Sequence, residues 1–302
     1  MTAEKLQELP VPLPEPSEQK RIASFLDYET AKIDALIEKQ QQLIALLGEK
    51  RQAVISHAVT KGLNPDAPMR DSGVEWLGEV PSHWSVSQLK YIIKPGTSIT
   101  YGIVQAGPEI EDGVPYIKTS DMSGDQLPTS GYARTSKAID QSYSRSRVFP
   151  GDIVISIRAS VGKCLAVPDE LHVANLTQGT AKISPGKKVR RDFLIAYMSG
   201  QSVQDYLMSM AKGATFKEIT LDMLRRVPAL VPPDEEQAEI IELVQSKEHK
   251  FNSLIEAANQ QSELLRERRT ALISAAVTGK IDVRSWKPPS SAAKSETEME
   301  VA

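Results

Sequence analysis

The sequence predicts an α+β protein in which one mixed α/β domain is inserted between two long helices that pair with each other. Residues 10–60 and 228–278 align without a gap at an offset of 218, and 20 of the 51 aligned positions are identical. Both copies have apolar residues at three- and four-residue spacing, which is typical of amphipathic helices. The segment between them instead has short strand-like runs separated by Gly, Pro, Ser and Asp.

The first long helix is expected at 17–61. Prolines within residues 10–16 hold the backbone extended, and Ser17 is a suitable N-cap. The apolar stripe then continues to Val59, and Gly62 ends it. Residues 1–16 are interpreted as a Pro-rich lead-in and the remnant of an upstream domain, because the match between the copies extends back toward the first residues.

The inserted domain is expected at 85–227, after a linker and aromatic anchor at 62–84. Strand-like runs occur at 116–120, 152–157, 163–167 and 180–183, and the apolar spacing at 192–213 predicts one or two helices. These patterns predict a mixed α/β arrangement of about 150 residues, near the usual size of one domain.

The second long helix and its lead-in are assigned to 228–281, and the Pro/Ser/Ala-rich tail at 282–302 is expected to be disordered. Each helix of about 40 residues would be roughly 60 Å long. The stripes allow parallel or antiparallel pairing, and a coiled coil that only dimerises is the simpler alternative. The residues expected to pair the helices are Leu36, Leu43, Leu47, Leu254, Leu264 and Leu265.

Charge is distributed unevenly along the chain. Residues 85–226 contain 18 Lys+Arg and 13 Asp+Glu, a balance of +5, whereas the remainder has 18 and 26, a balance of −8. Seven of the eight tyrosines also lie in this basic middle, and basic groups interleaved with aromatic residues suit contact with nucleic acid. The alternative is that these basic and aromatic residues are ordinary surface residues of an α/β domain.

Four polar loops mix Arg or Lys with Ser, Thr, Asn or Gln, at 134–147, 157–163, 175–180 and 211–217. These residue types bind phosphates and base edges. A solvated loop is the simpler interpretation for any single residue, but the set as a whole favours double-stranded DNA as a partner. The candidate DNA contacts are Tyr101, Lys118, Arg134, Arg145, Arg147, Arg158, Ser160, Lys163, Gln178, Lys212, Thr215 and Lys217.

Composition also excludes several classes of protein. The single cysteine, Cys164, excludes an internal disulfide and a zinc site of cysteine pairs, and no metal ligand set is expected. No run of eighteen apolar residues and no signal-like start appear, so we expect a cytoplasmic protein without a membrane span.

The motifs DSGVEWLGEVPSHWSVSQLKYI (71–92), PGDIVISIRASVGK (150–163) and GATFKEITLDML (213–224), with the proline-led starts of both helices, resemble the specificity subunit of type I restriction-modification systems. This resemblance covers nearly the whole chain. It implies target recognition domains that each bind one half of a split DNA site, joined by long helices that pair as an antiparallel coiled coil. It also implies that these helices dock methyltransferase (M) subunits and, through them, the restriction (R) subunit.

One departure from the family is the presence of a single recognition domain between two helices, where relatives usually have two. The chain is therefore expected to bind one half-site by itself. It is either a truncated or recombined form that pairs with another copy (a homodimer) or with a second fragment, or a sequence trimmed from a longer one.

An enzyme is the competing class, because Pro233-Asp234, Glu248 and Lys250 form a nuclease-like pattern. Glu248 and Lys250 lie two apart on the expected helix and so point to different sides. The resemblance implies a non-catalytic chain without a cofactor, with S-adenosylmethionine, Mg and ATP on partner subunits. An adaptor that assembles partners without sequence-specific DNA binding is the remaining alternative.

Overall fold

The computed structural model describes residues 13–213 and 217–288. It divides into two compact units, one formed by the described parts of residues 1–49 and 250–302 and the other by residues 50–249. We refer to these as the rod unit and the lobe unit. Within the described residues, no helix is both long enough and apolar enough to cross a membrane.

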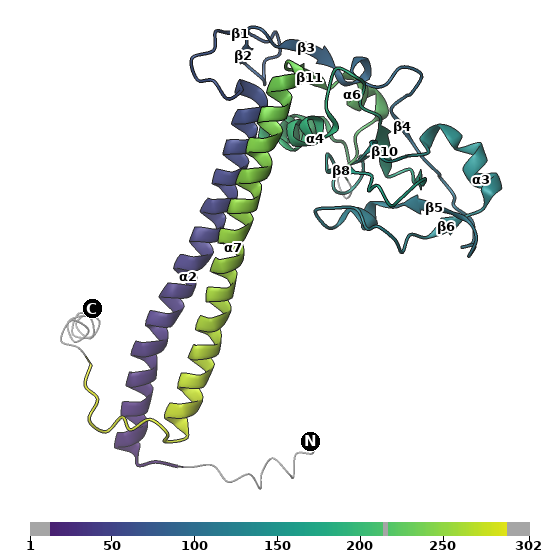
Figure 1. Cartoon of the computed structure of the whole chain (residues 1–302). Helices are drawn as coiled ribbons and strands as arrows, with labels where there is room; N and C mark the ends of the chain where they lie inside the picture. The colour runs from purple at the N-terminus through teal and green to yellow at the C-terminus, as the bar shows by residue number, and fades with distance from the viewer. Residues whose placement is uncertain (1–12, 214–216, 289–302) are drawn as a thin grey trace. The chain divides into compact units, whose positions relative to one another are not determined.

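Two long helices contribute to both units, α2 (Pro16–Lys61) and α7 (Asp234–Val277). Within the rod unit they lie side by side and antiparallel (Figure 1), because Asp34 of α2 forms an ion pair with Arg269 of α7 and Phe25 contacts Trp286 beyond the end of α7. The expected pairing of two long helices is confirmed.

Least-exposed positions on each rod helix alternate at four- and three-residue spacing, which is the pattern of a coiled-coil seam. On α2 they are Leu26, Thr30, Ile33, Ile37, Gln40, Ile44 and Leu47, and on α7 they are Phe251, Ile255, Ala258, Ser262, Leu265, Arg269, Leu272 and Ala276. The seam therefore contains polar residues as well as apolar ones.

In the described part of the lobe unit, short strands form four small sheets. The central antiparallel sheet has the order β4-β10-β7-β8, formed by Thr100–Tyr101, Thr180–Ile183, Ile153–Ser156 and Cys164–Ala166. A second sheet has the order β6-β5-β9, formed by Arg134–Thr135, Val114–Ile117 and Asn175–Leu176, with β5 and β9 parallel. Two-stranded sheets are β1 (Met69–Asp71) with β2 (Glu79–Pro81), and β3 (Ser85–Gln88) with β11 (Pro228–Val231).

Short helices complete the lobe (Figure 1). They are η1 (Leu89–Tyr91), η2 (Thr119–Met122), α3 (Lys137–Ser142), η3 (Ser144–Ser146), α4 (Arg191–Ser199), α5 (Gln201–Met210) and α6 (Leu221–Arg226). The helical pattern expected at 192–213 is therefore two helices. Residues 119–120, expected to continue a strand, instead begin the 3-10 helix η2, because the Asp121 carboxylate accepts a hydrogen bond from the Lys118 N–H and turns the chain.

The main hydrophobic core of the lobe lies where α4 and the central sheet meet the linker, and it buries Trp84, Phe193 and Tyr197. Trp84 is the predicted aromatic anchor. Its indole Nε1–H donates to Glu236 of α7 at 2.9 Å, and the strand β11 pairs with β3 directly after the linker. The start of α7 is thus fixed to the lobe by both side-chain and backbone contacts.

The domain bounds differ from the expected ranges at two places. Pro228–Val231, grouped with the second helix, form a strand of the lobe, and α7 itself begins at Asp234. Val283 and Trp286, grouped with the tail, pack in the rod unit, where Trp286 contacts Phe25 and Tyr28. Residues 289–302 of the expected disordered tail and residues 1–12 of the expected lead-in and remnant lie outside the described residues.

Candidate functional site

Four chain segments of the lobe meet beside the start of β10. The N–H of Ile157 donates to the carbonyl of Gly179 at 3.0 Å, and the N–H of Gln178 donates to the carbonyl of Ile103 at 3.1 Å. The N–H of Thr177 donates to the carbonyl of Ile117 at 3.1 Å. Backbone hydrogen bonds therefore hold the ends of β5, β7 and β9 and the residues after β4 next to one another.

Glycines allow this close approach. A Cβ added to Gly102 would lie 1.9 Å from the carbonyl oxygen of Leu176, and one added to Gly179 would lie 2.5 Å from Oγ1 of Thr119. The clash at Gly102 is with a backbone atom, so only glycine permits that close backbone approach, whereas a side chain at Gly179 would require the Thr119 side chain to move.

A fifth part of the chain, represented by residues 212, 217 and 218, lies against the loop that follows β7. The N–H of Ala159 donates to the carbonyl of Lys217 at 3.1 Å, and Lys212 and Glu218 exchange backbone hydrogen bonds of 2.9 Å each. Ala159 has a φ of 65°, a left-handed conformation that costs a non-glycine residue energy. The packed neighbours hold this loop in a shape that its own sequence does not favour.

These segments bring together eight of the twelve predicted DNA-contact residues, which we call the loop cluster. Its members are Tyr101, Lys118, Arg158, Ser160, Lys163, Gln178, Lys212 and Lys217. Thr215, which was predicted with them, lies outside the described residues.

The cations of the loop cluster differ in their partners. Arg158 forms an ion pair of 2.9 Å with Glu218, and Nζ of Lys163 donates to the carbonyl of Ser123 at 2.9 Å. Lys212 and Lys217 are exposed and form no ion pair within the described part of the chain. The cluster therefore presents cations held by internal contacts and exposed cations without an ion pair to a described residue, a combination suited to a polyanion.

The other three predicted residues lie on the segment 134–147, which includes β6, α3 and η3. Arg134 donates to the carbonyl of Gly113 at 2.9 Å. Nε of Arg147 donates to Asp140 at 2.9 Å and its NH2 group donates to Gln141 at 2.8 Å. Arg145 is exposed and has no such bond to a described residue. Arg147 is thus committed to internal contacts, which argues against the predicted contact with DNA, whereas Arg145 is available.

The pKa shifts of two basic side chains agree with the internal role of Arg147. Hydrogen bonding to Asp140 raises the pKa of the Arg147 guanidinium above its usual value. Nearby, burial lowers the pKa of the Lys182 ammonium, whose Nζ donates to the carbonyl of Arg147 at 2.8 Å. Both groups are structural parts of the lobe.

Sequence reasoning missed the residues that organise the site, namely Asp140, Asn175, Glu218 and Gly102. Asn175 was visible only as the first residue of a polar loop, and Asp140 only as an acidic residue among basic ones. The close approach at Gly102 depends on a strand more than seventy residues away in the chain, at Leu176.

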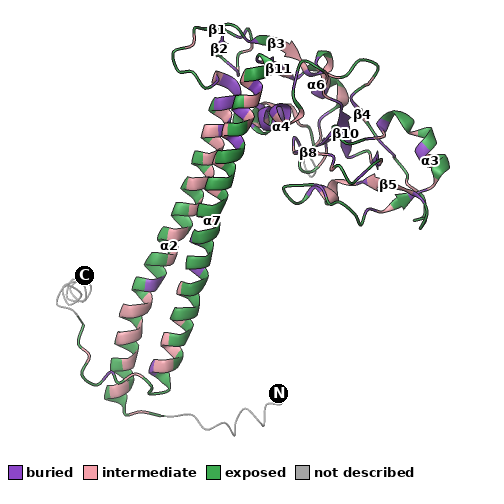
Figure 2. Ribbon diagram, in the orientation of Figure 1, coloured by how far each residue is buried: buried purple, intermediate pink, exposed green. Residues whose placement is uncertain are grey.

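The rod unit contains the other predicted set, the helix-pairing leucines. Leu47 and Leu265 are half-buried in the seam. Leu36, Leu43, Leu254 and Leu264 are instead 48%, 44%, 44% and 64% exposed, so they lie outside the seam series. Leu46 is 61% exposed, and we call these five exposed side chains of α2 and α7 the outer leucines. Figure 2 shows that exposed stretches occur along both long helices.

The nuclease-like pattern does not form a site. Asp234 and Glu248 lie on one continuous helix, 14 residues and therefore about 21 Å apart along its axis. Asp234 is also engaged by Arg190, whose two nitrogens donate to its carboxylate at 2.8 and 2.6 Å. No group of three or more potential metal ligands occurs among the described residues.

Comparison with known proteins gives consistent matches. Residues 81–264 match the family described as type I restriction modification DNA specificity domain. The type I restriction enzyme EcoBI specificity subunit of Escherichia coli is 29% identical over 95% of this chain and 61% of that protein. The putative type I restriction enzyme MjaX specificity subunit of Methanocaldococcus jannaschii is 27% identical over 93% of this chain and 61% of that protein.

A solved structure shares the fold. A chain from a study of complex assembly and conformational transition of the type I R-M system superposes with a TM-score of 0.63 at 22% identity, over 92% of this chain and 63% of that one. This chain thus spans about three fifths of the length of these relatives.

Proposed function

The chain belongs to the family of type I restriction modification DNA specificity domains, and we propose that it is the non-catalytic sequence-recognition subunit of a type I restriction-modification complex. Its lobe binds one half of a bipartite DNA site, and its helices dock methyltransferase subunits. The observation that carries this proposal is the loop cluster, in which five separate segments present basic and polar side chains at one end of a small sheet.

The loop cluster suits a DNA groove in both charge and hydrogen-bonding groups. Lys212 and Lys217 are exposed and can neutralise phosphates, a contact that supplies affinity without sequence preference. Arg158 and Gln178 have the fork-shaped donor and acceptor groups that pair with guanine and adenine edges in the major groove. Glu218 limits the rotation of the Arg158 guanidinium, which reduces the entropy lost when it binds a base.

A mobility-shift titration at rising salt tests the DNA-binding part. Binding that neutralises several phosphates weakens steeply with salt, and selection from a random duplex library should return one short half-site. The variant Arg158→Ala should lose the selected preference while remaining folded. Binding that is insensitive to salt, or a library that returns no common sequence, would favour an adaptor without sequence-specific DNA binding.

The outer leucines support the docking part of the proposal. At the repeat offset of 218, exposed Leu36 matches Leu254 and exposed Leu46 matches Leu264, so both helices present the same two apolar side chains. Exposed apolar groups at equivalent places on both helices are typical of partner contacts. Two equivalent surfaces fit two methyltransferase subunits, with the restriction subunit joined indirectly through them.

Chemistry then belongs to the partners. S-adenosylmethionine, Mg and ATP would be bound by the methyltransferase and restriction subunits, and the complex would work in the cytoplasm on double-stranded DNA. A homodimer or a second specificity-subunit fragment would supply the other half-site. Co-purification with the methyltransferase subunit, followed by mass measurement of the intact complex, tests this composition, and a chain that purifies without that subunit would contradict it.

A further inference from the structure

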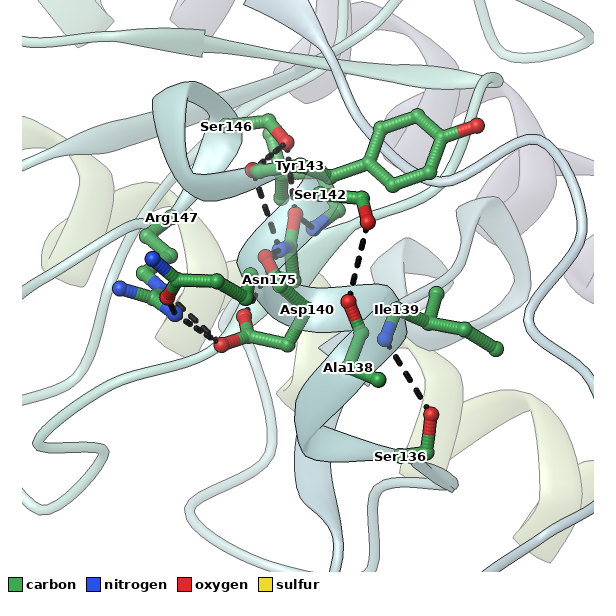
Figure 3. Close-up of polar contacts among 11 residues, drawn as sticks. Ser136, Ala138, Ile139, Asp140, Ser142, Tyr143, Ser146, Arg147 and Asn175 are labelled. Atoms are coloured by element: carbon green, nitrogen blue, oxygen red, sulfur yellow. Dashed lines mark hydrogen bonds and ion pairs between the residues drawn. The ribbon is translucent and has the colours of Figure 1, made fainter.

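A buried polar network joins the segment 134–147 to Asn175 of β9 (Figure 3). Asn175, which is fully buried on β9, donates from Nδ2 to Asp140 at 2.9 Å and to the carbonyl of Tyr143 at 3.3 Å. Its Oδ1 accepts from the hydroxyl of Ser146 at 2.7 Å and from the N–H of Leu176 at 2.8 Å. Asp140 and Ser146 are themselves 3% and 2% exposed.

The network satisfies every hydrogen-bonding position of the Asn175 amide. A primary amide provides two donors and two acceptor lone pairs on one planar group. An aspartate here would bring a second carboxylate against Asp140, and an apolar residue would remove one hydrogen-bond partner each from buried Ser146 and Asp140 at a cost. The chemistry of the site therefore requires asparagine for a reason that packing alone does not supply.

The network connects α3 and η3 to the sheet at several points. Asp140 holds Arg147, and the carbonyl of Arg147 in turn accepts from buried Lys182 of β10 at 2.8 Å. Between these fixed positions, Arg145 lies in η3 with its side chain exposed. The backbone on both sides of Arg145 is thus held, while its guanidinium is left available.

Asn175 also belongs to the strand that leads into the loop cluster. It pairs with Tyr116 in the parallel β5-β9 ladder, and the next residues, Leu176 and Thr177, make the backbone contacts that hold Ile103 and Gly102. One amide therefore joins the segment that presents Arg145 to the segment that presents Gln178.

We propose that Asn175 is a positioning residue that fixes Arg145 relative to the loop cluster and thereby determines part of the half-site sequence. This inference rests on the proposed DNA-binding function and extends it to a residue that cannot touch DNA. Arg145 is the specificity-determining side chain of the segment, and Arg147 is part of its support.

The test compares base preference with non-specific affinity in the full chain. A random duplex library is first selected with the wild-type chain, and the chosen duplex and an unrelated duplex are then titrated against Asn175→Ala. Loss of one positioned base contact should weaken binding to the selected duplex about tenfold or more, while affinity for the unrelated duplex stays within about twofold because phosphate contacts remain. A second selection with the variant should return a half-site relaxed at some positions.

Gln237→Ala is the matched control. Gln237 is a buried amide, 1% exposed, that also makes three hydrogen bonds, to the N–H of Arg190 and the carbonyls of Lys188 and Pro232, away from the loop cluster. It should lower stability without changing base preference. A folded Asn175→Ala chain with unchanged base preference, or with equal losses on both duplexes, overturns the proposal.

A milder variant covers the case in which Asn175→Ala fails to fold. Ser146→Ala removes one hydroxyl, which lies 2.7 Å from Oδ1 of Asn175 and 2.8 Å from the carbonyl oxygen of Tyr143, and it should shift base preference in the same direction by a smaller factor. Unchanged preference in that folded variant also overturns the proposal. Failure of the underlying function is distinguishable, because the wild-type chain would then select no common sequence before any variant is examined.

Discussion

The carboxylate of Asp34 lies 2.9 Å from Nε of Arg269, joining α2 to α7 within the rod unit. Arg269 occupies a seam position, and Asp34 flanks the seam. At the repeat offset their counterparts are Asn252 and Arg51, so both copies place an arginine at the same seam position. A shift of one helix along the other would leave this arginine among apolar side chains without a carboxylate, so the pair favours one antiparallel register.

Reversing one charge should destabilise the rod. Asp34→Lys places two cations together, and we expect a loss of about 0.5–1 kcal/mol in unfolding free energy, because the pair is partly exposed and screened. The double variant Asp34→Lys with Arg269→Glu should recover most of that loss. Urea midpoints followed by helical circular dichroism measure both, and a single variant as stable as the wild type would show that the pair does not set the register.

The outer leucines should affect assembly and leave folding unchanged. Leu46→Lys and Leu264→Lys change side chains that are 61% and 64% exposed, so stability should change by less than about 0.5 kcal/mol. Co-purification with the methyltransferase subunit should be lost, because each variant puts a charge into an apolar contact.

Their neighbours in the chain provide the control. Leu47 and Leu265 lie in the seam, so Leu47→Lys and Leu265→Lys should cost about 2 kcal/mol or more and lower the thermal midpoint. Partner binding that survives both Leu46→Lys and Leu264→Lys would place the docking surface elsewhere on the chain.

These adjacent leucines also show how far the sequence predicts the rod. The repeat and the apolar spacing predict two matched helices and their pairing. They do not separate Leu264 from Leu265, both of which were expected to pair the helices, because a broad apolar stripe fits a helix in more than one rotation. Thr30, Gln40, Ser262 and Arg269 all occupy the seam, and a search for apolar residues alone passes over them.

In the lobe, prediction from the sequence is limited in a different way. Loop composition was sufficient to find six of the eight residues of the loop cluster, because each loop carries its own basic and polar groups. It could not separate Arg145 from Arg147, since each follows a serine in the sequence SRSR. That distinction comes from Asp140 and Asn175, and Asn175 reaches the segment only through the pairing of β9 with β5.

Gly102 should tolerate no side chain. The Cβ of alanine would lie 1.9 Å from the Leu176 carbonyl oxygen, a backbone atom held in a ladder, so Gly102→Ala should cost about 3 kcal/mol. It should also weaken binding to the selected duplex, because Tyr101 and Gln178 lie on either side of this contact.

Gly48→Ala provides the comparison, since it lies within α2 with nothing within 4 Å of the added Cβ. That variant should gain roughly 0.5–1 kcal/mol from helix propensity. Denaturant titration gives the unfolding free energy of both variants. Equal changes in that free energy would contradict the close approach at Gly102.

Tyr132 should make the lobe sensitive to alkaline pH. Burial, with a contribution from the negative charge of Asp121, raises the pKa of its phenol to about 12, and its hydroxyl donates to the carbonyl of Pro128. The unfolded chain releases this proton near its ordinary value of about 10. Above that pH the unfolded state binds fewer protons than the folded state, so stability is fully present below about pH 10 and falls as pH rises toward 12.

Tyr132→Phe should start less stable, because the hydrogen bond to Pro128 is lost, but its stability should fall less between about pH 8 and about pH 11. Burial also raises the pKa of Tyr197, so part of the alkaline decline should remain in that variant. Tyr91→Phe, at a side chain that is 67% exposed, should keep the full wild-type decline. Urea midpoints of the wild type and the two variants, taken at about pH 8 and about pH 11, measure the loss of stability. If Tyr132→Phe loses as much stability as Tyr91→Phe, the alkaline sensitivity belongs to another group.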